Sequence, residues 1–309
     1  MRLITYCCIV FMLATGAAWA TITVTEFPIC TDAGSQYIPA ISGDTVVWYD
    51  WRNGNYDIYG YDLSTHSEFA ICTAAGGQYY PAISGDTVVW EDEHNRIWDI
   101  YGYDLSTHSE FAICTAVAGQ YKPAISGDIV VWHDFRNGCD IYGYDLSTHT
   151  EFPICTAADG QYKPAISGDI VVWQDYRNGN YDIYGYDLST HSEFPICTAA
   201  GDQWEPAISG NTVVWQDNRN GNWDIYGYNL TTRQEFQVCA EIGDQNTPAI
   251  SDNTVVWQDN RSGGYSTTDI YGATITYGPE PVPEPATLAL IAPALLGFAG
   301  IAFRKMRRG

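Results

Sequence analysis

The stretch that decides the fold is PAISGDIVVWQDYRNGNYDIYGYD at residues 164–187, and close copies of it occur six times along the chain. Its tryptophan recurs every 41 or 42 residues, at Trp48, Trp90, Trp132, Trp173, Trp215 and Trp257. A period of this length is typical of an array of one supersecondary unit. Residues shared by all copies are expected to build the frame, so a specific function should lie where the copies differ or outside them.

Each unit is predicted to form four short strands separated by turn signals. Examples are residues 81–83, 87–90, 182–188 and 193–197. The first strand contains proline in every copy and the fourth in several, whereas the second and third contain none. Because proline cannot donate to a strand ladder, we expect the first and fourth strands to be the edges of each sheet.

Four-stranded units with this period predict an all-β fold, a closed six-bladed β-propeller over residues 21–277. The chain starts with an isolated copy of the fourth strand, residues 26–30. It ends with a copy of the third strand, residues 269–272, that no fourth strand follows. We therefore expect the N-terminal strand to complete the last blade and close the ring.

Composition limits the class of function. The chain has 309 residues, 46% of them hydrophobic, which suffices for a large core. Its formal net charge is −23. An acidic surface of this kind excludes nucleic acid as the expected partner, because phosphates require basic groups.

The two ends of the chain carry targeting signals. Residues 1–20 resemble a cleavable signal peptide, with Arg2, a short apolar stretch and Ala18-Trp19-Ala20 as the cleavage site. An uncleaved anchor is the alternative. Residues 278–285 form a Pro/Glu linker, and residues 286–309 an apolar run that ends in a basic cluster. Such a run is near the lower length limit for a membrane-spanning helix, with its basic end in the cytoplasm.

The C-terminal segment resembles a known sorting signal. The motif Pro283-Glu284-Pro285, followed by a short apolar helix and a basic end, is similar to the PEP-CTERM signal. The resemblance implies an exosortase as processing partner and delivery to the surface or extracellular polymer of a Gram-negative bacterium. A plain tail anchor is the alternative.

The repeat itself resembles two families of propellers. It is similar to the six-bladed TolB-like propellers, and more closely to the repeat of archaeal surface-layer and related cell-surface proteins, through its V-W-x-D-x-R-N-G-N-x-D-I-Y-x-Y-D-L-S-T phrase. This resemblance implies surface display and no particular chemistry. One departure is a histidine where glycine is common in the turn before the fourth strand, at His66, His108, His149 and His191. Because these histidines lie on separate blades, we expect solvated turn residues rather than a metal site.

Six cysteines occupy one equivalent place in the repeats: Cys30, Cys72, Cys114, Cys155, Cys197 and Cys239. Equivalent points on neighbouring blades should lie beyond disulfide reach, so we interpret these cysteines as small buried apolar residues. Cys139 is separate, in a loop shortened by one residue.

The loop between the second and third strands, Asp50 to Asp57 in the first copy, superficially resembles a calcium loop. An arginine, Arg52, stands where a ligand oxygen would be needed, so we expect an Asp–Arg pair with Asx-type turn bonding. We predict no metal site and no cofactor, with weak calcium binding as the alternative.

Two variable positions should lie near the loop face and the mouth of the central channel. One precedes the proline of the first strand, and the other follows the phrase V-V-W-x-D. Aromatic groups with interleaved polar groups suit a sugar or peptide ligand, with ordinary drift at exposed sites as the alternative. The candidate ligand-binding residues at these positions are Trp51, Tyr80, Lys122, Phe135, Lys163, Tyr176 and Glu205.

The repeated residues contain no singular nucleophile beside a base, as catalysis would require. The sequence therefore predicts a non-enzymatic, exported and monomeric propeller with a binding or structural role in envelope or biofilm polymer. Extracellular polysaccharide or peptide is the expected ligand, and the membrane is contacted through the C-terminal helix. The alternative is an enzyme acting on extracellular polysaccharide, with its site on the loop face.

Overall fold

The computed structural model describes residues 27–93, 96–261 and 268–277. These residues form 23 strands arranged in six antiparallel sheets. The predicted signal peptide at residues 1–20 and the predicted linker and sorting segment at residues 278–309 lie outside the described residues. Within the described part of the chain, no helix is long and apolar enough to cross a membrane.

Each sheet is one blade, and the strand order from the centre outward follows the chain. The innermost strands are β1 (Gln36–Ser42), β5 (Gln78–Ser84), β9 (Gln120–Ser126), β13 (Gln161–Ser167), β17 (Gln203–Ser209) and β21 (Gln245–Ser251). The second strands are β2 (Thr45–Asp50), β6 (Thr87–Asp92), β10 (Ile129–Asp134), β14 (Ile170–Asp175), β18 (Thr212–Asp217) and β22 (Thr254–Asp259).

The third strands are β3 (Asp57–Asp62), β7 (Asp99–Asp104), β11 (Asp140–Asp145), β15 (Asp182–Asp187), β19 (Asp224–Asn229) and β23 (Asp269–Thr274). The outer strands are β4 (Ser67–Cys72), β8 (Ser109–Cys114), β12 (Thr150–Cys155), β16 (Ser192–Cys197) and β20 (Gln234–Cys239). The prediction of an all-β, six-bladed propeller is confirmed, as is the placement of the proline-bearing strands at the sheet edges.

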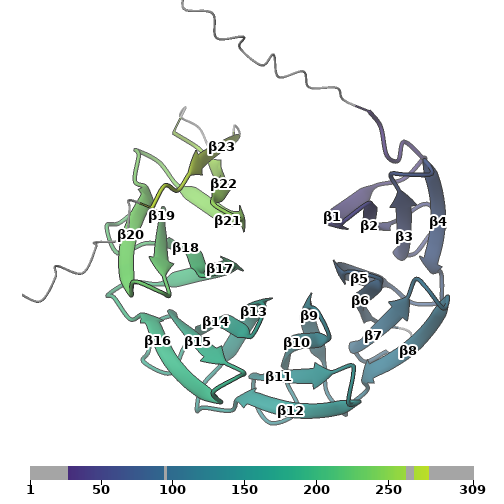
Figure 1. Cartoon of the computed structure of the whole chain (residues 1–309), viewed down its shortest axis with the longest axis horizontal. Coiled ribbons are helices and arrows are strands. Elements are labelled where there is room, and N and C mark those ends of the chain that lie inside the picture. The colour runs from purple at the N-terminus through teal and green to yellow at the C-terminus, as the bar shows by residue number, and fades with distance from the viewer. Residues whose placement is uncertain (1–26, 94–95, 262–267, 278–309) are drawn as a thin grey trace, which may run out of the picture.

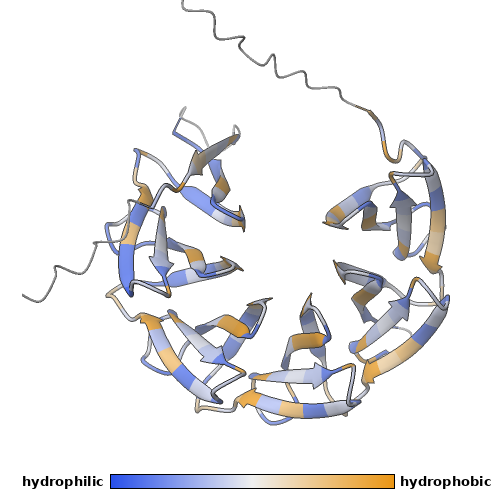
Figure 2. Cartoon of the chain, viewed as in Figure 1, coloured by the Kyte–Doolittle hydropathy of each residue, from blue (hydrophilic) through white to orange (hydrophobic). Residues whose placement is uncertain are grey.

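The hydrophobic core is divided among the interfaces between successive blades. At the interface of the third and fourth blades, Val131, Ile141 and Ile154 pack against Val171 and Trp173. Equivalent clusters recur at the other interfaces, and Figure 2 shows apolar segments at the same end of β8, β12 and β16. Each blade thus depends on its neighbours for burial, as in other repeat proteins.

The predicted closure of the ring is wrong in this structure. The sixth sheet has three strands, β21, β22 and β23, and residues 27–30 form no strand with β23. Ile29 and Cys30 do pack against Val46 and Trp48 of the first blade, as Ile71 and Cys72 pack against Val88 and Trp90 of the second, so the pairing with β23 is the part of the prediction that fails. The first and sixth blades lie on either side of a gap (Figure 1).

The repeat explains why closure could not be read from the sequence. Each copy encodes the packing of one blade on the next, and closure depends on the sum of five such rotations. The order of strands along the chain identifies which strand is missing from the last blade. That order does not by itself bring together segments about 240 residues apart, because their approach costs loop-closure entropy.

The gap leaves apolar side chains of the sixth blade exposed. Val256 is 41% exposed and Ile270 is 70% exposed, whereas their equivalents in the fifth blade, Val214 and Ile225, are fully buried. The same residue types at the same repeat positions therefore differ only in whether a following blade covers them.

This difference predicts unequal effects of one substitution. Val214→Ala should lower the free energy of unfolding by about 2 kcal/mol, because two buried methyl groups and their contacts are lost. Val256→Ala should cost less than about 0.5 kcal/mol, as at other exposed sites. Urea unfolding measures both variants, and equal losses would show that the sixth blade is covered in solution.

Candidate functional site

A bulge in each innermost strand places one variable side chain at the mouth of the channel. The register with the second strand shifts just before the proline, as between Tyr121 and Ala124 in β9. The residue that precedes each proline takes a positive φ, between 46° and 54°. These residues are Ile38, Tyr80, Lys122, Lys163, Glu205 and Thr247. The left-handed backbone is costly for residues other than glycine, so neighbouring contacts must hold it in place.

The preceding blade supplies such a contact. The Lys122 amide donates to Glu91 Oε1 at 2.7 Å, and the Thr247 amide donates to Gln216 Oε1 at 2.8 Å. The Glu205 amide donates in the same way to Gln174. The acceptor is in each case the residue after the repeated tryptophan, so this position orients the bulge of the next blade.

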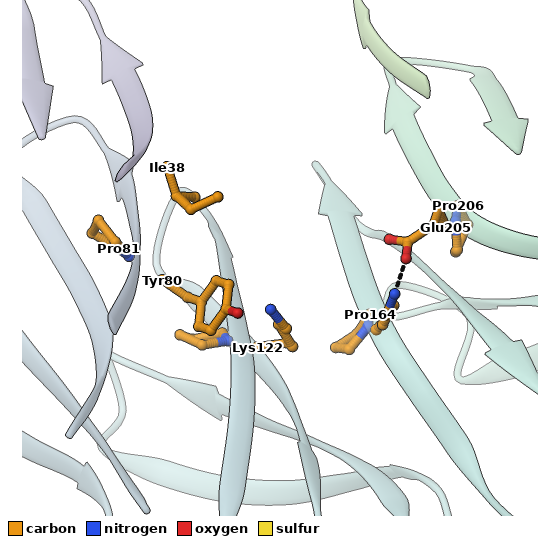
Figure 3. Close-up of a pocket in the computed structure, with 9 residues that line it drawn as sticks. Ile38, Tyr80, Pro81, Lys122, Pro164, Glu205 and Pro206 are labelled. Carbon is orange, nitrogen blue, oxygen red and sulfur yellow. Dashed lines mark ion pairs between the residues drawn. The ribbon is translucent and has the colours of Figure 1, made fainter. Parts of the chain in front are cut away.

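Four of the seven predicted binding residues come together at the channel mouth. Tyr80, Lys122, Lys163 and Glu205 line a cavity of about 360 Å³ with Ile38 and the adjacent prolines. Lys163 forms an ion pair with Glu205, and Figure 3 shows Lys122 beside the ring of Tyr80. The Lys122 Nζ atom lies 2.9 Å from the centre of that ring, a cation–π contact. Burial lowers the pKa of Lys122 and of Lys163.

A second cavity, of about 700 Å³, opens between the second and third blades and shares Tyr80 and Lys122 with the first. We call it the aromatic cavity. Its other lining residues are Tyr79, Glu91, Trp98, Gly119, Tyr121, His133 and Phe135. Large rings around a few buried polar groups are the usual composition of a small-molecule site.

Two titratable side chains of the aromatic cavity are strongly buried. Burial raises the pKa of Glu91 to about 7, although the Lys122 amide and the Lys122 charge act in the opposite direction. Burial lowers the pKa of His133 to about 3, and the charges of Lys122 and Lys163 act in the same direction. At neutral pH the cavity therefore holds a neutral imidazole and a carboxyl group close to its midpoint of titration.

The aromatic cavity belongs to a longer row of rings. Successive centroids lie 4.7 to 6.0 Å apart along a chain of contacts that crosses five blades. This aromatic belt consists of Tyr37, Tyr49, Tyr56, Tyr79, Trp98, Tyr121, His133, Tyr162, Tyr181, Trp204 and Trp223. It does not continue through β21, where Asn246 stands in place of the tyrosine or tryptophan.

The remaining predicted residues lie apart from one another. Phe135 lines the aromatic cavity, but Trp51 and Tyr176 lie on other blades and pack against Tyr56 and Tyr181. Each of the three is 41% to 45% exposed.

Sequence reasoning missed Glu91 and His133. The signal was available, because the residue after the repeated tryptophan varies among Tyr49, Glu91, His133, Gln174, Gln216 and Gln258. Glutamate and histidine at a position that carries glutamine in three copies mark a difference between the copies.

The loop that resembled a calcium site is held by an Asp–Arg pair, as predicted. Arg52 Nη2 lies 2.7 Å from Asp50 Oδ2, and the Arg52 amide donates to Asp50 Oδ1. The other loop side chains also bond within the loop, as where Asn53 and Asn55 donate to Asp57. No group of three or more metal-binding side chains occurs in residues 27–93, 96–261 and 268–277.

The repeated cysteines are free thiols, buried in every blade except at Cys30, which is half-buried. Each of five accepts a contact from an arginine of the next blade, such as Arg136 Nη2 at 2.9 Å from Cys114 Sγ. The reading of small buried residues is therefore confirmed, with an added polar contact between blades. The four turn histidines are exposed, as expected.

No family model matches this chain, and no curated protein matches it. Solved structures do share its fold. TolB from Acinetobacter baumannii is similar at 18% identity with a TM-score of 0.53, over 72% of this chain and 58% of that chain. A putative TolB from Agrobacterium tumefaciens is similar at 17% identity with a TM-score of 0.54, over 68% of this chain and 82% of that chain.

The β-propeller domain of the Trilobed protease from Pyrococcus furiosus, described as having an open velcro topology, is similar at 14% identity. Its TM-score is 0.62, over 79% of this chain and 84% of that chain. These structural similarities support a TolB-like six-bladed propeller fold. The neighbours include both TolB and a protease domain, and at these identities the likeness concerns the fold alone.

Replacing Glu91 tests the electrostatics of the aromatic cavity. Because the pKa of Glu91 is raised in the folded state, its protonated form stabilises the fold at low pH, and this stability is lost as pH rises from about 4.5 to 7. Glu91→Gln keeps an acceptor for the Lys122 amide, as Gln174 and Gln216 do in other blades. The variant should therefore gain about 2 kcal/mol over wild type between pH 5 and pH 8.

The measurement is urea unfolding of both proteins across this pH range. His133 contributes the opposite slope, because its pKa is lowered, but it does so in both proteins and cancels in the difference. A difference between wild type and variant that is constant with pH would contradict the raised pKa of Glu91.

Proposed function

We propose that the protein is an exported, non-enzymatic propeller that binds an extracellular polysaccharide through the aromatic cavity. The observation that carries the proposal is the aromatic cavity itself, where rings of two blades surround Glu91 and Lys122. Sugar rings present apolar faces and hydroxyl groups, so aromatic walls and buried polar groups complement both. The site lies where the copies differ, and the aromatic belt extends it over neighbouring blades.

The charges near the channel mouth favour an acidic polysaccharide over a neutral one as the ligand. The chain is strongly acidic overall, at −23, yet Lys122 and Lys163 lie on adjacent innermost strands at the channel mouth. Lys163 is paired with Glu205, whereas Lys122 faces the ring of Tyr80. A polymer with carboxylate-bearing sugars would be attracted to Lys122 in preference to a neutral one.

An enzyme acting on extracellular polysaccharide remains the second candidate. Glycoside hydrolysis usually requires two carboxyl groups that flank the bond to be cleaved. Glu91 is the one carboxylate among the described residues that line the aromatic cavity. This arrangement favours binding over hydrolysis as the proposed role.

A glycan array with the propeller domain tests the ligand class. Binding to acidic polysaccharides is expected, and Trp98→Ala or Tyr121→Ala should weaken it about tenfold by removing a stacking wall. Trp51→Ala is the matched control, since this exposed aromatic residue lies outside the cavity. Undiminished binding by the cavity variants would refute the site, and release of shortened polymer would refute the non-enzymatic role.

We further propose delivery by a PEP-CTERM type of tail, on the strength of the sequence Pro283-Glu284-Pro285 with its apolar and basic continuation. Glu284→Ala should leave the protein unprocessed and associated with the membrane fraction. Glu280→Ala, in the Pro-Glu-Pro that precedes it, is the matched control and should be delivered normally. Cell fractionation with immunoblotting measures both, and normal delivery of Glu284→Ala would exclude this sorting route.

A further inference from the structure

The loop before the third strand holds an asparagine amide in a constant position in three blades. In the first blade, Asn55 Nδ2 donates to Asp57 Oδ1 at 2.8 Å, to Ala74 O at 3.0 Å and to Gly76 O at 2.6 Å. One carboxylate and two carbonyl oxygens thus share a single nitrogen.

The fourth and fifth blades repeat this arrangement. Asn180 Nδ2 lies 2.8 Å from Asp182 Oδ1 and 2.7 Å from Gly201 O. Asn222 Nδ2 lies 2.7 Å from Asp224 Oδ1 and 2.8 Å from Gly243 O. In both blades a second carbonyl completes the set at 3.4 Å.

The third blade lacks this asparagine. Its loop runs Asn137-Gly138-Cys139-Asp140, one residue shorter than Asn53-Gly54-Asn55-Tyr56-Asp57. The amide of Gln161 donates to Cys139 O as that of Gln78 donates to Tyr56 O, so Cys139 corresponds to Tyr56 and the deleted residue is the asparagine.

The oxygen atoms that the asparagine would bind are still present. Asp140 is 5% exposed and has no hydrogen-bond donor among the described residues. It lines a cavity of about 660 Å³ together with Ala157 and Asp159, which correspond to Ala74 and Gly76. The neighbouring Arg136 is bound to Asp134 and Glu151. A largely buried carboxylate without a protein donor is costly unless a ligand, a proton or water in the cavity satisfies it.

We propose that this cavity, which we call the third-blade seat, binds a primary ammonium group in the place of the missing asparagine nitrogen. An ammonium group has three N–H donors, which match one carboxylate and two carbonyl oxygens. Its charge complements Asp140, whose pKa is raised by burial and by the nearby Asp134.

The geometry of the other blades favours nitrogen over a bare metal ion. There the shared nitrogen lies 2.6 to 3.4 Å from its oxygens, which is the spacing of N–H···O bonds. Calcium requires oxygens at about 2.3–2.6 Å and six to eight of them. The cavity also far exceeds the roughly 30 Å³ occupied by one water molecule, so it has room for the rest of a ligand.

The walls of the seat suggest what carries the ammonium group. Phe135, Tyr142 and Tyr162 line the same cavity and offer ring faces and edges to a ligand body. An amino sugar and a lysine side chain share the required ammonium, and the experiment separates these two sources.

Calorimetric titration of the propeller domain with glucosamine, and with an Nα-acetylated lysine amide, tests the seat. Saturable binding of at least one ammonium compound is expected, and the tighter of the two identifies the source. N-acetylglucosamine, which lacks the charged donor, should bind about tenfold more weakly or not at all.

Two variants locate the binding at the seat. Insertion of asparagine between Gly138 and Cys139 restores the loop of the first, fourth and fifth blades, so it should abolish binding while the thermal unfolding temperature stays equal or rises. Asp140→Asn should weaken binding about tenfold or more. Asp182→Asn is the matched control, because its carboxylate already accepts from Asn178 and Asn180, and should bind as wild type does.

Several outcomes would overturn the inference. Failure of both ammonium compounds to bind, undiminished binding by the insertion variant, or calcium binding that the insertion abolishes would each do so. The seat does not rest on the proposed polysaccharide site: Trp98→Ala should leave ammonium binding unchanged, which separates failure of one from failure of the other.

Discussion

The buried aspartate at the end of each second strand is the group on which the architecture depends. In the third blade, Asp134 is fully buried, accepts the Trp132 indole N–H and pairs with Arg136, whose guanidinium reaches Cys114 Sγ of the preceding blade. One carboxylate thereby orients the tryptophan of the interface, closes the loop and ties two blades together. At Asp50, burial by itself would raise the pKa, but the bonds from Arg52 and Trp48 outweigh it and hold the pKa below its ordinary value. Loss of either partner would leave a charge buried without compensation, which is strongly destabilising.

Because these aspartates stabilise the blades, each innermost strand can tolerate a strained backbone at one variable position. Proline interrupts the ladder of each inner strand, and the bulge gives the preceding residue a positive φ. At Lys122, Glu205 and Thr247, the blade before it supplies a side-chain acceptor for the amide of that residue. The side chain at the bulge is then held at the channel mouth whatever its type. This arrangement explains how Tyr80, Lys122, Lys163 and Glu205 share one backbone geometry yet bring four different chemistries to a single cavity.

Local features of the sequence predicted the structure well, and features that depend on distant segments did not. Proline placement identified the edge strands, and the arginine in the loop identified an ion pair, because both act within a few residues. Closure failed because it depends on how five interfaces add together, whereas the contact of Ile29 and Cys30 with the first blade depends on one interface and is present. At the site, the bulge residues were predicted correctly as neighbours at the channel mouth because they vary at the position before a repeated proline. Glu91 and His133 were missed because their position appeared to belong to the tryptophan motif, although it faces the next blade.

The deletion in the third blade shows how a repeat protein can acquire a site without new residues. In the first, fourth and fifth blades an asparagine satisfies the carboxylate from within the chain, and the set of oxygens has only a structural role. Without that residue, the surrounding oxygens are still held by three neighbouring contacts. Arg136 bonds to Asp134 and to Glu151, and Cys139 Sγ donates to Gln161 O. Asp140 then has no hydrogen-bond donor among the described residues of the chain, so an external donor that binds to it gains the free energy of that hydrogen bond. Specificity for an ammonium group follows from the positions of these oxygens, which in the copies that keep the asparagine surround a nitrogen atom at hydrogen-bonding distance.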